Sequence, residues 1–235
     1  ISIRYNAEAG LHNPLRFFYL IMNPGSVMTL GVYFICVFMP VSIAAALLEV
    51  LRRPVPKWLT WTGIVSAFCV AAYTGFLLGV VSAYPLWNNA ILPVLFVVSA
   101  LSAGLAATSL VGLITDRERF EQMWLIKKSH VILSAIEMVV LATMLIIVSS
   151  GSPEGAASVA SLVSGQYAPM FWGGLVLLGL VAPFAIEGYP VFVTRKVETS
   201  TTSMVVSVIG EGGVLVGGFM LRLLVILAAL PVLYL

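Results

Sequence analysis

Three glutamates and one arginine stand inside long apolar stretches of this sequence: Glu137, Glu187, Glu211 and Arg222. An ionisable side chain within a bilayer is costly unless it is paired or solvated, so each of these residues is a candidate functional group. A buried carboxyl can be neutral at rest and still exchange a proton. Proton transfer is therefore the chemistry that these residues suggest, while hydrogen bonding between helices remains an alternative for one or two of them.

A second group of polar residues surrounds the stretch from Tyr73 to Asn89. Tyr73 lies within an apolar run, and Trp87, Asn88 and Asn89 follow where that run ends. Arg222 belongs with this group by depth, because it lies about three turns beyond Glu211 on the same helical face, about 16 Å away. Trp87 is either a contact residue or an ordinary aromatic residue of the membrane interface, the reading that we favour for Tyr84 and Trp172.

The elements that must hold these residues are membrane-spanning helices. The chain is 60% hydrophobic and only 9% charged, whereas soluble domains carry about 25% charged residues. We therefore expect an all-α fold, a polytopic transmembrane helix bundle that forms one integral membrane domain over residues 1–235. Apolar runs of the required length, about 20 residues, predict six spans, at about 26–50, 58–81, 90–114, 128–149, 170–189 and 203–233.

The loops between these runs sort by charge. Nine of the twelve Lys and Arg residues lie in RRPVPK, DRERFEQMWLIKK and TRK, whereas SAYPLWNN and GSPEGAASVASLVSGQYAP contain none. The positive-inside rule places the three basic loops in the cytoplasm and the other two outside. Arg4 and Arg16 fall on the outer side, against the rule, but the three basic loops contain more Lys and Arg residues and decide the predicted orientation.

With this orientation, four ionisable residues lie in the cytoplasmic half of the bundle. Glu137 and Glu211 lie about 12 Å from the inner ends of their helices, and Glu187 lies nearer that surface. His130, seven residues before Glu137 and on the same face, stands at the inner mouth, where it is either a proton carrier or a solvated interfacial residue. We expect His130, Glu137, Glu187 and Glu211 to form a proton path.

Several kinds of redox centre are excluded on this chain. His12 and His130 are the only histidines, and they fall on opposite sides of the membrane, which excludes a bis-histidine haem. Cys36 and Cys69 lie in apolar runs and form no CxxC motif, so no iron–sulfur cluster or metal is expected. The small net charge, +2, gives no reason to expect nucleic acid. Electrons for any redox reaction must come from another subunit or a diffusible carrier.

Three motifs resemble one known family. YTGFLL followed by PLWN and LPVLFVVSALSAGLA is similar to the central signature of the NrfD/polysulfide reductase (PsrC-like) membrane subunits. GLHNPLRFFYLIMNPGSVMTLG and GGFMLR resemble the segments on either side. Because smaller family members have eight helices, the resemblance implies that the first two helices precede this sequence. The chain begins with Ile1, and it is expected to start partway into a longer protein.

The resemblance implies a quinone-reactive membrane subunit of a respiratory oxidoreductase complex, with menaquinone or ubiquinone as its bound substrate. Tyr73 matches the family position that binds the quinone head, and Arg222 is expected beside it. Trp87, Asn88 and Asn89 are expected to contact a ferredoxin-like iron–sulfur subunit, which would connect to a molybdopterin catalytic subunit. The implied location is the prokaryotic cytoplasmic membrane, with partner subunits on the outer, periplasmic face. Proton translocation would make the complex electrogenic.

Two other classes of function stay open from the sequence. The intramembrane acids alone also suggest a transporter or ion channel. A passive membrane anchor for a catalytic complex is the third reading. The sequence leaves open the terminal substrate and the direction of electron flow.

Overall fold

The structure is a computed structural model that describes residues 25–115, 124–189, 192 and 201–230. These residues are helical with short connections, and no strand occurs among them. Six of their helices are long and apolar enough to cross a membrane, at Val27–Val50, Lys57–Gly79, Ile91–Leu113, Lys128–Gly151, Met170–Tyr189 and Val205–Leu227. The predicted all-α fold with six spans is confirmed, and the protein is a multi-pass integral membrane protein. The RRPVPK loop is described, whereas 1–24, DRERFEQ and TRK lie outside the described residues.

Contacts divide the chain into two compact units, residues 1–77 and 78–235. The first unit contains α2 (Val27–Val50) and most of α3 (Lys57–Gly79). Helix α2 ends where Arg52 adopts a positive φ of 54°. The backbone N–H of Arg53 then bonds Leu48 and that of Arg52 bonds Glu49, the pattern of a Schellman cap. Whether both units behave as the single membrane domain expected from the sequence stays a prediction.

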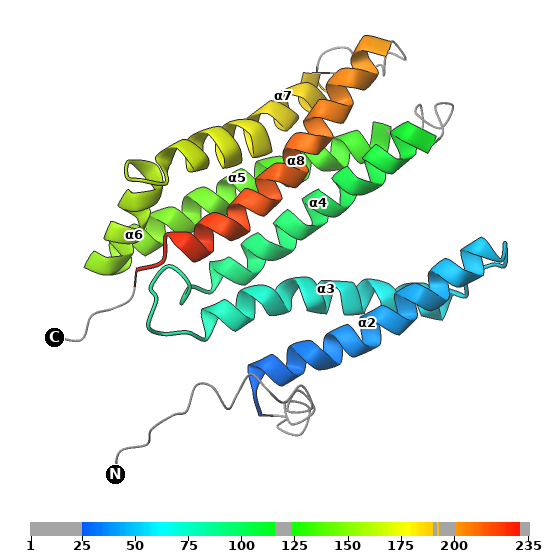
Figure 1. Cartoon of the computed structure of the whole chain (residues 1–235), viewed down its shortest axis with the longest axis horizontal. Helices are drawn as coiled ribbons and strands as arrows, with labels where there is room; N and C mark the ends of the chain where they lie inside the picture. The colour runs from blue at the N-terminus through cyan, green and yellow to red at the C-terminus, as the bar shows by residue number, and fades with distance from the viewer. Residues whose placement is uncertain (1–24, 116–123, 190–191, 193–200, 231–235) are drawn as a thin grey trace, which may run out of the picture. The chain divides into compact units, whose positions relative to one another are not determined.

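The second unit is a helical bundle. It contains α4 (Ile91–Thr115), α5 (Trp124–Gly151), α6 (Pro153–Val163), the π-helix η4 (Met170–Val181), α7 (Ala182–Tyr189) and α8 (Thr201–Leu227) (Figure 1). Helix α4 packs against α5 and α8, and α7 also packs against both. Helices α4 and α7 thus each contact both α5 and α8. Leu95, Met144, Leu175, Leu221 and their neighbours form the apolar core.

Glycines permit the closest helix packing in this unit. A Cβ on Gly217 of α8 would overlap the backbone of Gly179 in η4, and a Cβ on Gly179 would overlap Gly217 in the same way. One turn earlier in α8, Gly213 lies against the carbonyl of Leu178. Small residues that let two helix backbones approach are the usual basis of packing in membranes. The contact with η4 thus explains Gly213 and Gly217 of α8.

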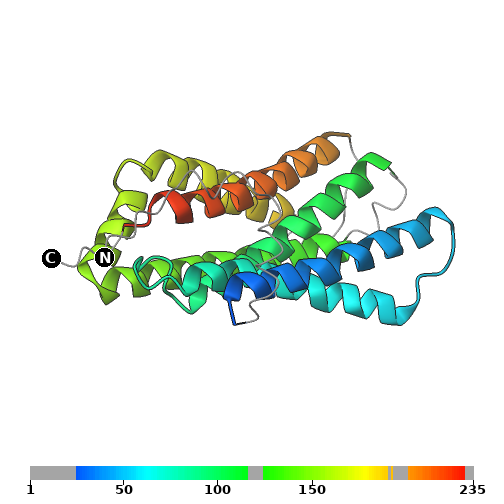
Figure 2. The same ribbon diagram turned by 60° about the horizontal axis from the view of Figure 1, so that its bottom comes forward.

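Two predicted boundaries are wrong. The loop expected at 150–169 contains helix α6, which is capped by the Ser152 side chain accepting from the Gly155 backbone N–H at 3.0 Å, with Pro153 in its first turn. The last helix ends at Leu227 rather than near residue 233, because a residue before a proline such as Pro231 is disfavoured in the helical conformation. The end of α8 lies beside α6 in both views (Figures 1 and 2), where the Leu230 backbone N–H donates to Ser158.

Candidate functional site

Tyr73 is held by contacts within the first unit. Its ring covers Gly31 of α2, where a Cβ would overlap the ring. Its hydroxyl is 3.4 Å from the Met28 carbonyl oxygen, beyond the usual range for a strong O–H···O hydrogen bond. Both Met28 and Gly31 lie in the first turns of α2. The phenol is thus fixed in position while its hydroxyl remains able to donate to another acceptor.

An apolar groove lies on the same two helices. It has a volume of about 410 Å³ and is lined by Phe34 and Val37 of α2 and, on α3, by Trp61, Thr62, Val65, Ser66 and Cys69. Tyr73 follows Cys69 by one turn on α3, and Gly31 precedes Phe34 by one turn on α2. The Tyr73 hydroxyl therefore stands next to one end of a slot that is otherwise almost entirely apolar.

The second unit contains a buried pair formed by His130 and Glu211. The Nε2 atom of His130 on α5 lies 3.2 Å from Oε2 of Glu211 on α8, and both side chains are 1% exposed. His130 and Glu211 thus lie together inside the bundle, with His130 buried rather than solvated; that they carry protons stays a prediction. A histidine and a carboxyl at this distance can exchange a proton, because each can hold or release one.

A second polar pair lies farther along the same helices. Arg222 interacts electrostatically with the Glu137 carboxyl. The guanidinium also donates from Nη1 to the Gly218 carbonyl at 2.7 Å and lies 5.6 Å from the centre of the Phe96 ring. Glu137 is only 4% exposed, so a compensating cation is the physical requirement for a charged carboxylate here.

Glu187 is also buried, on α7, which packs against both α5 and α8. Glu187 and the four residues of the two buried pairs therefore lie in one bundle; that they form a proton path stays a prediction. Arg222 belongs to this bundle, whereas Tyr73 belongs to the first unit, so their shared role in one quinone site stays a prediction. No group of three or more metal-ligating side chains occurs in the described part of the chain.

The Trp87–Asn89 segment has structural bonds of its own. The indole N–H of Trp87 donates to the Val225 carbonyl at 2.7 Å, and Tyr84 stacks on its ring at 4.2 Å. The Asn89 side chain accepts from the backbone N–H of Ile91 at 2.9 Å, at the start of α4. Asn88 is exposed. Two of the three predicted contact residues thus also stabilise the bundle.

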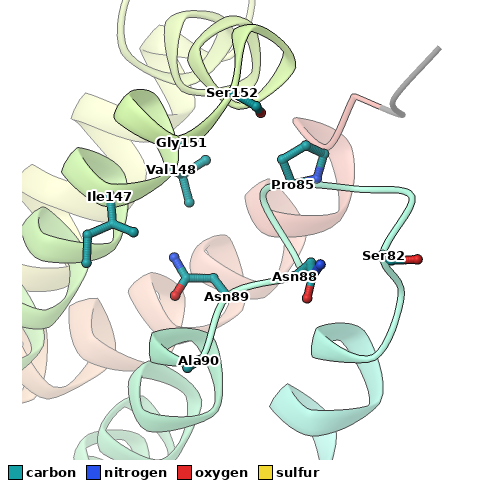
Figure 3. Close-up of a pocket in the computed structure, with 9 residues that line it drawn as sticks. All are labelled: Ser82, Pro85, Asn88, Asn89, Ala90, Ile147, Val148, Gly151 and Ser152. Atoms are coloured by element: carbon teal, nitrogen blue, oxygen red, sulfur yellow. The ribbon is translucent and has the colours of Figure 1, made fainter. Parts of the chain in front are cut away.

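A pocket of about 370 Å³ opens beside this segment. Figure 3 shows the Pro85–Ala90 loop on one side and the end of α5 with Ser152 on the other. Its lining residues include Asn88, Asn89 and two serines but no charged side chain. The pocket suits neutral polar groups that exchange hydrogen bonds with amides.

Sequence reasoning missed several residues of these sites. Gly31 and Phe96 acquire their roles only through contacts with Tyr73 and Arg222, which are distant in sequence. Ser99 and Ser102 stand among the small residues of LPVLFVVSALSAGLA. Both are 1% exposed, and their Oγ atoms have no hydrogen-bond partner of normal geometry. A serine pair with i, i+3 spacing next to an ionisable set is the signal that would have identified them.

The fold and the buried polar groups describe a multi-pass membrane protein with an ionisable interior. The family model "Polysulphide reductase, NrfD" matches residues 10–233, and the chain belongs to this family, as the sequence resemblance indicated. The C chain of polysulfide reductase from Wolinella succinogenes is 30% identical over 75% of this chain and 63% of its own length. Protein NrfD of Escherichia coli is 30% identical over 76% of this chain and 54% of its own.

A third relative is the Protein NrfD homolog of Haemophilus influenzae, 28% identical over 70% of this chain and 50% of its own length. The chain thus spans about half to two-thirds of the length of these curated relatives. No solved structure matches the chain.

Proposed function

We propose that this chain is a quinone-reactive membrane subunit of a respiratory oxidoreductase complex. The observation that carries the proposal is the Tyr73 hydroxyl, held at the end of an apolar groove with only a long bond to Met28. Membership of the NrfD family supports it, and the relative from Wolinella succinogenes is by its name one chain of a polysulfide reductase.

The site fits the chemistry of a quinone. A quinone head has two carbonyl oxygens that accept hydrogen bonds, and its isoprenoid tail is apolar. The Tyr73 hydroxyl supplies a donor without the desolvation cost of a charge. The groove of Phe34, Val37 and Trp61 and their neighbours accommodates part of the tail. Menaquinone and ubiquinone both meet these requirements.

The reaction requires both electrons and protons. Interconversion of a quinone and its quinol transfers two electrons and two protons. The sequence predicts no redox centre on this chain. In the proposal an iron–sulfur subunit exchanges the electrons, and a molybdopterin subunit is their further source or destination. His130, Glu137, Glu187 and Glu211 carry protons through the second unit, with Arg222 stabilising the Glu137 carboxylate.

The iron–sulfur subunit is proposed to dock at Trp87, Asn88 and Asn89 on the periplasmic face of the cytoplasmic membrane. The support is the uncharged amide-lined pocket at this loop, together with the absence of basic residues from the loop itself. Exposed Asn88 is the residue to substitute here, since Trp87 and Asn89 also hold the bundle together.

The experiment uses the complex purified from its native membrane with all its subunits. Tyr73→Phe keeps the ring over Gly31 and removes only the hydroxyl. Losing one hydrogen bond, worth about 0.5–1.5 kcal/mol, should weaken quinol binding about two- to tenfold. Binding is measured from the quinol dependence of oxidation, with dissociation measured directly using a labelled quinone.

Tyr167→Phe is the matched control, because Tyr167 packs against the core of the second unit and does not line the groove. Unchanged quinol affinity and turnover in an intact Tyr73→Phe complex would remove Tyr73 from the site. A protein that purifies alone and takes up solute would favour a transporter. A complex without quinol activity in the wild type would favour a passive anchor.

A further inference from the structure

The two buried pairs of the second unit are separated by a gap. We call His130 with Glu211 the inner pair and Glu137 with Arg222 the outer pair. His130 and Glu137 are seven residues apart on α5, which corresponds to about 10 Å along the helix. A proton passes directly only between groups at hydrogen-bond distance, about 2.7–3.2 Å. At the backbone, the two pairs are thus separated along the helix by more than this distance, and polar groups in the gap would connect them.

Two serines of α4 border this gap. His130 lies against the backbone carbonyl of Ser102, and the Ser99 hydroxyl lies against the Glu137 carboxyl. Ser99 also neighbours the outer pair from the side of α8, since a Cβ on Gly218 would lie 3.6 Å from its Oγ and 3.5 Å from Nη1 of Arg222. Ser99 and Ser102 are one turn apart on one face of α4. By these contacts, Ser102 borders the inner pair and Ser99 borders the outer pair.

The hydroxyls of these serines behave differently from several others in the membrane-spanning helices α3, α4 and α5. Thr62, Ser66, Thr74, Thr108, Ser129 and Thr143 each donate to a carbonyl of their own helix, the common solution for such residues in an apolar environment. Ser99 and Ser102 do not, although both are 1% exposed. A buried hydroxyl whose hydrogen-bonding capacity is not filled destabilises the fold, and internal water is the usual ligand of such groups.

We propose that Ser99 and Ser102 bind internal water that connects the inner pair to the outer pair as a proton wire. Each hydroxyl and each water accepts a proton on one side and releases one on the other. One proton thus enters at the inner pair as another leaves at the outer pair, without net change in the wire. The role of the wire in turnover rests on the proposed quinone reaction, whereas the binding of water by the two serines does not.

The surroundings of the wire meet its electrostatic requirements. The ionisable residues facing this interior are His130 and Glu137 on α5, Glu187 on α7, and Glu211 and Arg222 on α8. Helices α4 and η4 contribute none. Among the described residues, the ionisable side chains around the wire are thus confined to α5, α7 and α8.

The first test is an experimental map of the assembled complex at a resolution that shows ordered water. One expected result is a single water within hydrogen-bond distance, about 2.7–3.2 Å, of the Oγ atoms of both Ser99 and Ser102. A chain of waters that connects the two Oγ atoms at such distances would support the proposal equally. A dry interior, or hydroxyls of Ser99 and Ser102 bonded to carbonyls of α4, would overturn the proposal. This result does not depend on any quinone activity.

The second test measures function in proteoliposomes that contain the complex and a pH indicator inside. Ser102→Val and Ser102→Thr have the same shape and differ only in the hydroxyl. The assay runs quinone reduction, with electrons supplied through the partner subunits, because that direction takes up two protons per quinone. Losing a positioned proton carrier should lower proton uptake from the inner side per quinone reduced by about tenfold or more in Ser102→Val. Ser102→Thr should restore it. Thr108→Val is the control, because Thr108 lies on the same helix but bonds its own backbone.

Each outcome of the second test decides a separate point. Wild-type proton uptake in Ser102→Val, or an equal loss in Ser102→Thr, would overturn the wire, the latter because packing would then explain the loss. Quinone reduction without proton uptake from the inner side in the wild type would also overturn it. A wild-type complex without quinol turnover contradicts the proposed function instead, and the map of internal water then decides whether the serines bind water.

Discussion

Tyr73 and Gly31 illustrate what a single residue pair adds to the sequence. Tyr73 is identifiable as a candidate because a hydroxyl within an apolar run needs a reason. Gly31 is not identifiable, because its role depends on a contact between two helices that no local pattern encodes. In the same way, the spacing of His130 and Glu137 predicted a shared face, but only the structure brings His130 to 3.2 Å from Glu211.

The Tyr73–Gly31 contact makes a prediction about Gly31. Gly31→Ala places a methyl group where the Tyr73 ring lies, so the ring and its hydroxyl must move. Because the displacement changes both the donor and the shape of the groove end, quinol affinity should fall by at least the two- to tenfold expected for loss of the hydrogen bond. Quinol titration of the purified complex measures this effect. Gly104→Ala, at a glycine with open space around it, should bind quinol like the wild type, and equal affinity of both variants would contradict the contact.

At the scale of helices, the spans were predictable and their details were not. Runs of about 20 uncharged residues identify membrane helices because the bilayer excludes charge and unpaired backbone. Helix α6 was missed because its small and polar residues resemble a loop, although Ser152, Pro153 and Glu154 form a recognisable helix start. The π-helical geometry of η4 has no comparable sequence signal. Helix η4 includes Gly179, whose backbone closely approaches Gly217 of α8.

The Gly179–Gly217 contact predicts a large effect from one methyl group. Gly217→Ala would overlap the backbone of Gly179, so η4 and α8 must separate at the cost of their packing. Overpacking of this kind costs about 1–3 kcal/mol, and the temperature at which the detergent-purified protein unfolds should fall. Gly212→Ala, on the same helix with open space at its Cβ, is the matched control. If both variants unfold at the wild-type temperature, the close approach is not needed for stability.

For the whole molecule, the orientation in the membrane determines the direction in which the buried residues would transfer protons. A proton path that opens toward the cytoplasm can make turnover electrogenic only if electrons are exchanged on the other side. The charge pattern of the loops supplies this orientation from the sequence, because basic residues are retained in the cytoplasm. The family match supplies the comparison with relatives, of which the chain spans about half to two-thirds.

The orientation predicts opposite labelling at two exposed positions. In a background with Cys36 and Cys69 replaced by alanine, Asn88→Cys should react with a membrane-impermeant maleimide in intact spheroplasts. Lys57→Cys should react only after the membrane is permeabilised, because RRPVPK is predicted to be cytoplasmic. Both native side chains are exposed, and Asn88, unlike Asn89, makes no bond to the start of α4 that the substitution would break. Labelling is first done without the partner subunits; if they dock beside Asn88, their presence should slow its reaction. Labelling of Lys57→Cys from outside would reverse the orientation, and with it the assignment of the inner pair to the cytoplasmic half of the membrane.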